Sequence, residues 1–172
     1  ANWNNNNKKI HIKSSIGKGV IPGLKIEGDY TPQTKKMDFT IELDKFRVNI
    51  FQPWASVLVS DLKGIVNGQL TLEGTTEKPD LNGSIRLMKT SMIVDYLQTR
   101  YNFSNDVKVV HNTMVIKDFE LFDEKGNKAM AQGNIYSKYF KEFSLEIKLE
   151  STNFAFLNTT EKNNGLFYGR IF

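Results

Sequence analysis

Few side chains in this sequence have the type and spacing that catalysis or metal binding requires. The two histidines, His11 and His111, lie far apart, and each stands beside apolar residues in a strand-like pattern. The chain has no cysteine and no His-x-x-x-His spacing, so the sequence does not predict a metal site. The run from Asp123 to Asn127 resembles a calcium loop, but it lacks the alternating oxygen ligands and the terminal glutamate. We therefore predict a hairpin turn there, with Gly126 free to adopt positive φ.

Paired carboxylates are the remaining route to catalysis, because glycoside hydrolysis uses two Asp or Glu residues on facing elements. Asp106, Asp118 and Glu120 are the candidates, but most acidic residues stand on the polar side of alternating strands. The chain also has no Gly-x-Ser-x-Gly nucleophile motif and no phosphate-binding glycine loop. We therefore predict that the protein is not an enzyme and that it needs no cofactor.

The composition narrows the choice of partners. The chain has 172 residues and a net charge of +4, with Lys and Arg scattered between acidic residues rather than gathered in a patch. A nucleic-acid partner is therefore not expected. No run approaches the ~18 consecutive apolar residues of a membrane-spanning helix. The chain lacks an initiator Met and stops in a strand-like pattern at 169–172, so we expect a piece of a longer protein, with any membrane anchor outside it.

Apolar and polar residues alternate with a period of two along most of the chain, which predicts strands. The pattern is plain in residues 24–30 and 37–43, and it is clearest in residues 143–150. Turn residues separate such runs, which predicts an all-β protein of about ten strands. Residues 44–60 break the pattern, and Pro53 suits a first helical turn. We predict at most one short helix, near Gln52–Val59, which covers one end of the sheet.

Glycines recur inside the predicted strands, at Gly68, Gly74, Gly83 and Gly133. Glycine within a strand marks a bulge, a bend or a close approach of two backbones. At similar places in successive strands, glycines favour a strongly curved, open-ended antiparallel sheet. We expect a polar lead-in at residues 1–8 and a single all-β segment at residues 9–172. The pattern alone leaves the apolar face as either a sandwich core or a lipid-facing groove.

From Leu62 onward the sequence closely resembles the C-terminal domain of the TamB family, in its Bacteroidetes-type form. The pieces that carry the resemblance occur in the family's order and spacing. They are GQLTLEGT at 68–75, KPDLNG at 78–83, VDYLQTRY at 94–101, KDFELFDEKG at 117–126 and NFAFLN at 153–158, which leads to LFYG at 166–169.

The resemblance implies a fold and a cellular setting. The family fold is a long sheet curled into a U-shaped trough with an apolar interior, the β-taco of AsmA-like and bridge-like lipid transfer proteins. The resemblance also implies a periplasmic protein that an N-terminal helix, outside this chain, anchors to the inner membrane. Its partner would be an outer-membrane barrel protein of the BamA/TamA type.

The function that this family implies is carriage of phospholipids toward the outer membrane. Each buried methylene of an acyl chain gains ~0.8 kcal/mol, so an apolar trough would favour acyl chains without any chemistry. The alternative is a scaffold for the insertion of outer-membrane β-barrel proteins or autotransporters, through strand addition. The residues that we predict to line the trough are Leu70, Leu72, Ile85, Leu87, Met92, Val94, Phe119, Leu121, Ile135, Phe143, Leu145, Ile147, Phe154 and Phe156.

Overall fold

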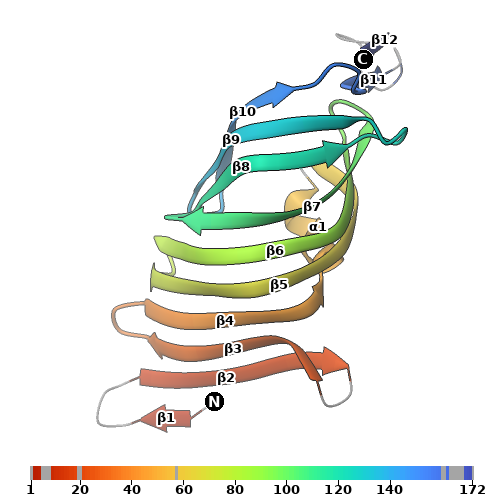
Figure 1. Ribbon diagram of the computed structural model, residues 1–172. Helices are drawn as coiled ribbons and strands as arrows, with labels where there is room; N and C mark the ends of the chain where they lie inside the picture. Colours follow the sequence, from red (N-terminus) through yellow and green to blue (C-terminus); the bar gives the residue numbers. More distant parts are fainter. Residues whose placement is uncertain are drawn as a thin grey trace.

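The computed structural model describes residues 2–4, 9–18, 21–56, 58–159, 162 and 169–171, and it is an all-β structure (Figure 1). The main sheet consists of β1 (Asn2–Asn4), β2 (Lys9–Lys18), β3 (Ile21–Thr31), β4 (Lys36–Arg47), β5 (Val59–Thr75), β6 (Pro79–Val94), β7 (Thr99–Val110), β8 (Thr113–Phe122), β9 (Lys128–Lys138) and β10 (Glu142–Glu150). Two further strands, β11 (Leu157–Thr159) and β12 (Gly169–Ile171), pair with each other in a separate small sheet.

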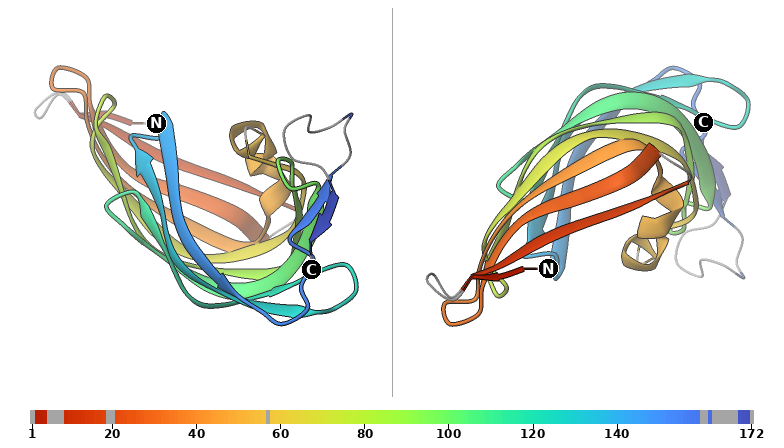
Figure 2. Two further views of the ribbon diagram at one scale, coloured as in Figure 1. Left: turned by 90° about the horizontal axis from the view of Figure 1, so that it is seen from above. Right: turned by 90° about the horizontal axis from the view of Figure 1, so that it is seen from below.

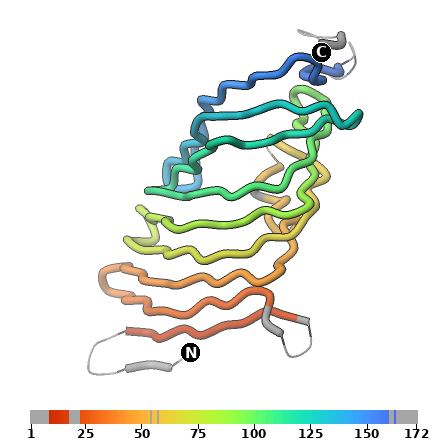
Figure 3. Tube along the Cα trace, in the orientation of Figure 1, coloured from red at the N-terminus to blue at the C-terminus, as the bar shows by residue number. Residues whose placement is uncertain are grey.

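The main sheet is an antiparallel meander. Its strands lie side by side in the order of the chain, and each is antiparallel to the next. The Cα trace therefore runs back and forth across the sheet without a crossover connection (Figure 3). The prediction of an all-β antiparallel fold is confirmed. The polar lead-in contributes β1, and residues 5–8 lie outside the described part of the chain.

The helical segments of the described chain are short and lie between β4 and β5. They are a 3-10 turn, η1 (Val48–Phe51), and one α-helical turn, α1 (Gln52–Ala55). The predicted helix thus begins where expected but ends before Val59, where β5 begins. The Gln52 side chain joins this turn to β5, because its amide nitrogen donates to the carbonyl of Val59 at 2.8 Å and its amide oxygen accepts from the N–H of Leu62 at 2.7 Å. These bonds hold the helix start against the beginning of β5.

The strands bend along their length, and α1 lies on the concave side of the bowed sheet (Figure 2). Within the strands, non-glycine residues with positive φ stand where the register shifts. Lys89 has a φ of 48° between Leu87 and Thr90, and Asp118 has a φ of 50° in the shift between Ile116 and Phe119. An extra residue of this kind bends a strand and increases its twist.

Glycines allow neighbouring backbones to approach closely within the sheet. Gly83 has a φ of 135°, and a Cβ there would overlap the carbonyl oxygen of Gln69 on β5. Gly133 has a φ of 146°, and a Cβ there would overlap the carbonyl oxygen of Glu146 on β10. The close backbone approach predicted for strand glycines is thus present. The sheet itself is open and not strongly curled, so the U-shaped trough stays a prediction.

Candidate functional site

One face of the sheet is apolar across almost its whole width, and we call it the apolar face. Residues that pair across strands point to the same side of a sheet. One row of such partners crosses from β3 to β10 and consists of Ile26, Ile41, Leu70, Gly83, Val109, Met114, Ile135 and Leu145. The next row consists of Leu24, Leu43, Gly68, Ile85 and Val107. Val48 of η1 packs against Leu43 and Val66, which places the apolar face on the concave side.

No second layer of strands covers the length of this face within the described chain, where the only other sheet is the short β11–β12 pair. The side chains are nevertheless buried to different degrees. Phe103 and Phe119 near the centre are buried, with ring centroids 5.1 Å apart. Leu145 and Ile147 on β10 are exposed. A sandwich core would need a second sheet against this face, and the described residues do not form one.

The structure places most of the predicted trough-lining residues on the apolar face. Those in β5, β6, β8, β9 and β10 share it, and they are Leu70, Leu72, Ile85, Leu87, Met92, Val94, Phe119, Leu121, Ile135, Phe143, Leu145 and Ile147. The bulge in β6 explains why Leu87 and Met92, at positions of opposite parity, face the same way. Phe154 and Phe156 differ, because they lie in a segment without strand structure.

That segment, residues 151–156, runs from the end of β10 back toward β7, and we call it the strap. The ring of Phe154 stacks on that of Tyr101, with centroids 5.1 Å apart and 10° between the ring planes. The Tyr101 hydroxyl lies 3.2 Å from the carbonyl oxygen of Ala155. Beyond the strap, the N–H of Asn158 donates to the carbonyl of Leu97 at 3.0 Å. Phe154 is buried by these contacts, whereas Phe156 is exposed.

A buried carboxylate holds the strap to the β8–β9 turn. Asp123 accepts hydrogen bonds from the backbone N–H groups of Lys125, Asn127 and Ala155 at 2.9, 2.8 and 3.0 Å, and from the Asn127 amide at 2.9 Å. Burial alone would raise the pKa of Asp123, but these hydrogen bonds outweigh it and lower the pKa below its usual value. The run from Asp123 to Asn127 is thus a turn that also fixes the strap, and Gly126 has the predicted positive φ.

Sequence reasoning missed several residues of the apolar face. Tyr101, Phe103, Val107 and Val109 alternate along β7 and are buried. Their spacing was a usable signal, because they stand at every second or fourth position. The strap contacts gave no such signal, since they join residues far apart in the chain.

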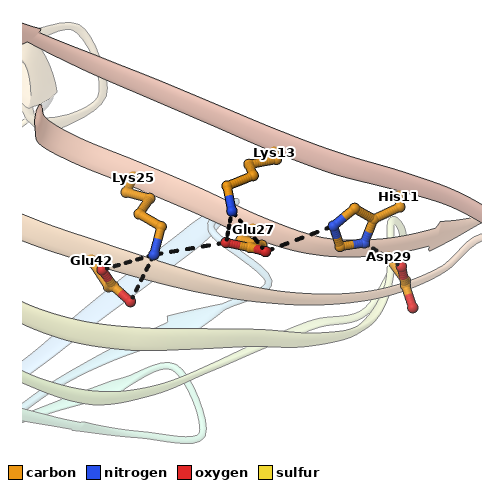
Figure 4. A network of polar contacts seen from close by, with 6 residues as sticks. All are labelled: His11, Lys13, Lys25, Glu27, Asp29 and Glu42. Carbon is orange, nitrogen blue, oxygen red and sulfur yellow. Dashed lines mark hydrogen bonds and ion pairs between the residues drawn. The ribbon is translucent and has the colours of Figure 1, made fainter. Parts of the chain in front are cut away.

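The opposite, convex face is polar and is crossed by ion pairs. Six residues of β2, β3 and β4 form a network there (Figure 4), with His11 Nδ1 2.9 Å from Asp29, Lys13 Nζ 3.1 Å from Glu27 and Lys25 Nζ 3.3 Å from Glu42. The hydrogen bond from Lys13 lowers the pKa of Glu27. His11 and His111 both lie on this polar side, and His111 Nδ1 is 3.0 Å from Asp80. These contacts are typical of a solvated face.

The hairpin turns at the ends of the strands opposite α1 form an open cleft of about 740 Å³. Lys78, His111 and Lys138 come to it from three successive turns, together with Tyr139 and Phe143. Asp80 and Glu142 line the cleft as well and lie within ion-pair distance of His111 and Lys138, so the cleft carries charges of both signs beside Phe143. It lies at the rim of the apolar face, at the ends of the strands opposite α1 and the strap.

The candidate catalytic carboxylates do not form an inward-facing pair. Asp106 forms a salt bridge with Arg86 at 2.6 Å, and Glu120 forms one with Lys128 at 2.5 Å. Among the described residues, no group of His, Asp and Glu is arranged to hold a metal ion. No helix in that part of the chain is long and apolar enough to cross a bilayer. Comparisons with protein-family models, with curated proteins and with solved structures found no match to this chain.

Proposed function

We propose that this chain is part of a periplasmic envelope-biogenesis protein whose apolar face carries phospholipid acyl chains between the inner and outer membranes. One observation carries the proposal, namely that rows of aliphatic side chains cross from β3 to β10 on the concave side and that no second sheet covers them among the described residues. The exposed part of the apolar face, Phe143, Leu145 and Ile147 on β10, is the kind of apolar surface that marks a site for a ligand or partner. The sequence resemblance to the TamB family supports an acyl chain as that ligand.

The energetics of such carriage depend on burial alone. Moving each methylene out of water is favourable by about 0.8 kcal/mol of free energy. An acyl chain bound to the face therefore avoids the cost of exposure to water between the membranes. The rim supports the same proposal, because Lys78 stands at the open hairpin side, where a phosphate headgroup would remain hydrated.

The proposal is tested by lipid transfer between vesicles of phosphatidylethanolamine and phosphatidylglycerol, with a fluorescent phospholipid in the donor vesicles. The full chain is expected to accelerate transfer and to carry phospholipid through purification, as native mass spectrometry would detect. Leu145→Asp places a charge on the apolar face at an exposed position, so the fold should survive while transfer falls to the protein-free rate.

Ser144→Asp is the matched control, because it adds the same charge to the same strand on the polar face. It should transfer lipid like the unmodified chain. Equal transfer by both variants, or absence of bound phospholipid from the purified chain, would overturn the proposal.

A second candidate function is a scaffold for outer-membrane β-barrel proteins. The observation that favours it is the open edge of β10. This strand pairs with β9 on one side, and no strand lies on its other side within the described sheet. An extended segment can add to such an edge through main-chain hydrogen bonds. In vesicles that hold a BamA/TamA-type barrel, this function predicts that Leu145→Asp slows barrel-protein insertion but leaves lipid transfer intact.

A further inference from the structure

The edge strand β10 is built for pairing with another strand. It pairs with β9 over nine consecutive residue pairs, from Glu142 to Glu150, without a register shift. Proteins usually protect an open edge with charged side chains, proline, a bulge or an inward-pointing charge. The described β10 carries charged residues on its polar side, but it has no proline, no bulge and no inward-pointing charge. Its inward residues are Phe143, Leu145, Ile147 and Leu149.

The following chain does not cover this edge in the described structure. After Glu150 the strap turns back toward β7, and the Ser151 hydroxyl donates to the carbonyl of Lys128 at 2.7 Å on β9. Phe143 and Leu145 therefore stay exposed, at 45% and 50% of their full surface. The edge offers free backbone groups beside an exposed apolar row.

The charges on the polar side of β10 select one partner. Lys148 pairs with Glu150 at 2.5 Å, and Glu142 lies 3.8 Å from Lys138. Glu146 instead accepts a hydrogen bond from the Tyr136 hydroxyl at 3.0 Å and has no cation within ion-pair distance among the described residues. An incoming strand that sets a cation opposite Glu146 would therefore be favoured.

We propose that β10 pairs antiparallel with β10 of a second copy of this chain, about a twofold axis through Ile147. In this register Glu146 lies opposite Lys148 of the second copy, and the reciprocal pair forms by symmetry. Leu145 lies opposite Leu149 of the second copy on the apolar side. The two sheets then form one sheet, and the two apolar faces become continuous.

Neighbouring registers fit less well. A pairing centred on Glu146 sets this residue opposite itself and Glu142 opposite Glu150, and like charges in direct opposition destabilise a sheet. A pairing centred on Leu145 sets Glu146 opposite Ser144, so Glu146 gains no cation. It also sets Lys148 opposite Glu142, which already has Lys138 nearby. The register centred on Ile147 is the one that gives Glu146 a cation.

Charge reversal and sedimentation velocity test the pairing. The unmodified chain should form a concentration-dependent dimer, since a single strand pair makes a small interface. Glu146→Lys and Lys148→Glu each create two like-charge pairs, so each alone should weaken dimerisation about tenfold or more. An equimolar mixture of the two variants should regain the dimer, because every opposed pair is then attractive. Glu73→Lys, on the polar face of β5, is the control and should leave the dimer unchanged.

A cysteine cross-link tests the register independently. The chain has no cysteine, so Ile147→Cys would face only its own counterpart across the axis, at a separation that suits a disulfide. It should cross-link under mild oxidation at least tenfold faster than Leu145→Cys. A monomer at all concentrations, a mixture that fails to recover, or faster cross-linking of Leu145→Cys would each overturn the proposal.

Discussion

Strands β7 and β10 carry the same alternation and point their apolar residues to the same face, yet they differ in burial. Phe103 and Val107 on β7 are 6% and 3% exposed, whereas Phe143 and Leu145 on β10 are 45% and 50% exposed. The alternation of a strand therefore defines which side its apolar residues face. It does not define how much of their surface is covered.

The neighbours of each strand explain the difference. β7 lies between β6 and β8, and the side chains of both strands pack around Phe103. The strap adds a further layer at Tyr101, where Phe154 stacks on the ring. β10 has β9 on one side and no strand on the other side within the described sheet. The centre thus stabilises the fold, and the edge leaves apolar surface for a ligand or a partner.

The largest expected effect separates two phenylalanines of the same face. Phe103→Ala should lower the free energy of unfolding by about 3–5 kcal/mol, because it leaves a cavity beside Phe119. Phe143→Ala should lower it by only about 1 kcal/mol, since the ring is already half exposed. Urea unfolding of both variants in dilute solution measures this difference. Equal losses would show that the centre and the edge contribute alike.

A smaller effect is expected where the strap meets the turn. Asp123→Asn keeps the shape of the side chain but removes the charge that accepts four hydrogen bonds, which should cost about 1.5–3 kcal/mol. The lowered pKa of Asp123 means that its stabilisation is present at neutral pH and is lost as the pH falls through the folded value. Unmodified protein should therefore lose stability in acid more steeply than the variant. If the free energy of unfolding of the two proteins changed with pH in the same way, the stabilising role of the Asp123 carboxylate would be contradicted.

The smallest effect concerns Tyr101 at alkaline pH. Burial raises the pKa of Tyr101 from 10.0 to about 12. The contribution of the protonated Tyr101 hydroxyl to the free energy of unfolding is thus fully present below about pH 10, and it declines as the pH rises toward 12. Tyr101→Phe should cost about 1 kcal/mol at neutral pH through the lost hydrogen bond, and this difference should shrink in alkali. Hydrogen exchange at the Ala155 amide would report the same change at the strap.

The sequence was sufficient to predict which residues form the apolar face, but it was not sufficient to predict that the strap covers part of it. Leu87 and Met92 both belonged to clear alternating runs, so the face could be followed through a bulge that was itself not predicted. The strap was not predictable, because Phe154 is buried by Tyr101 and Ala155 is held by Asp123, and no local pattern encodes such distant contacts. The strong curvature expected from the strand glycines and from the family resemblance is not present in the described sheet, because curvature depends on bulges and twist, which neither alternation nor glycine positions specify.

The meander also has a consequence for how such a sheet grows. Because each strand of the main sheet pairs only with the strands just before and after it in the chain, its contacts are local and can form strand by strand from one end. Energetically the sheet resembles a one-dimensional array, in which each hairpin interacts with its neighbours alone. Duplication of a hairpin would lengthen the sheet by two strands without changing the register elsewhere. The distance that such a protein spans can therefore evolve through the number of its hairpins.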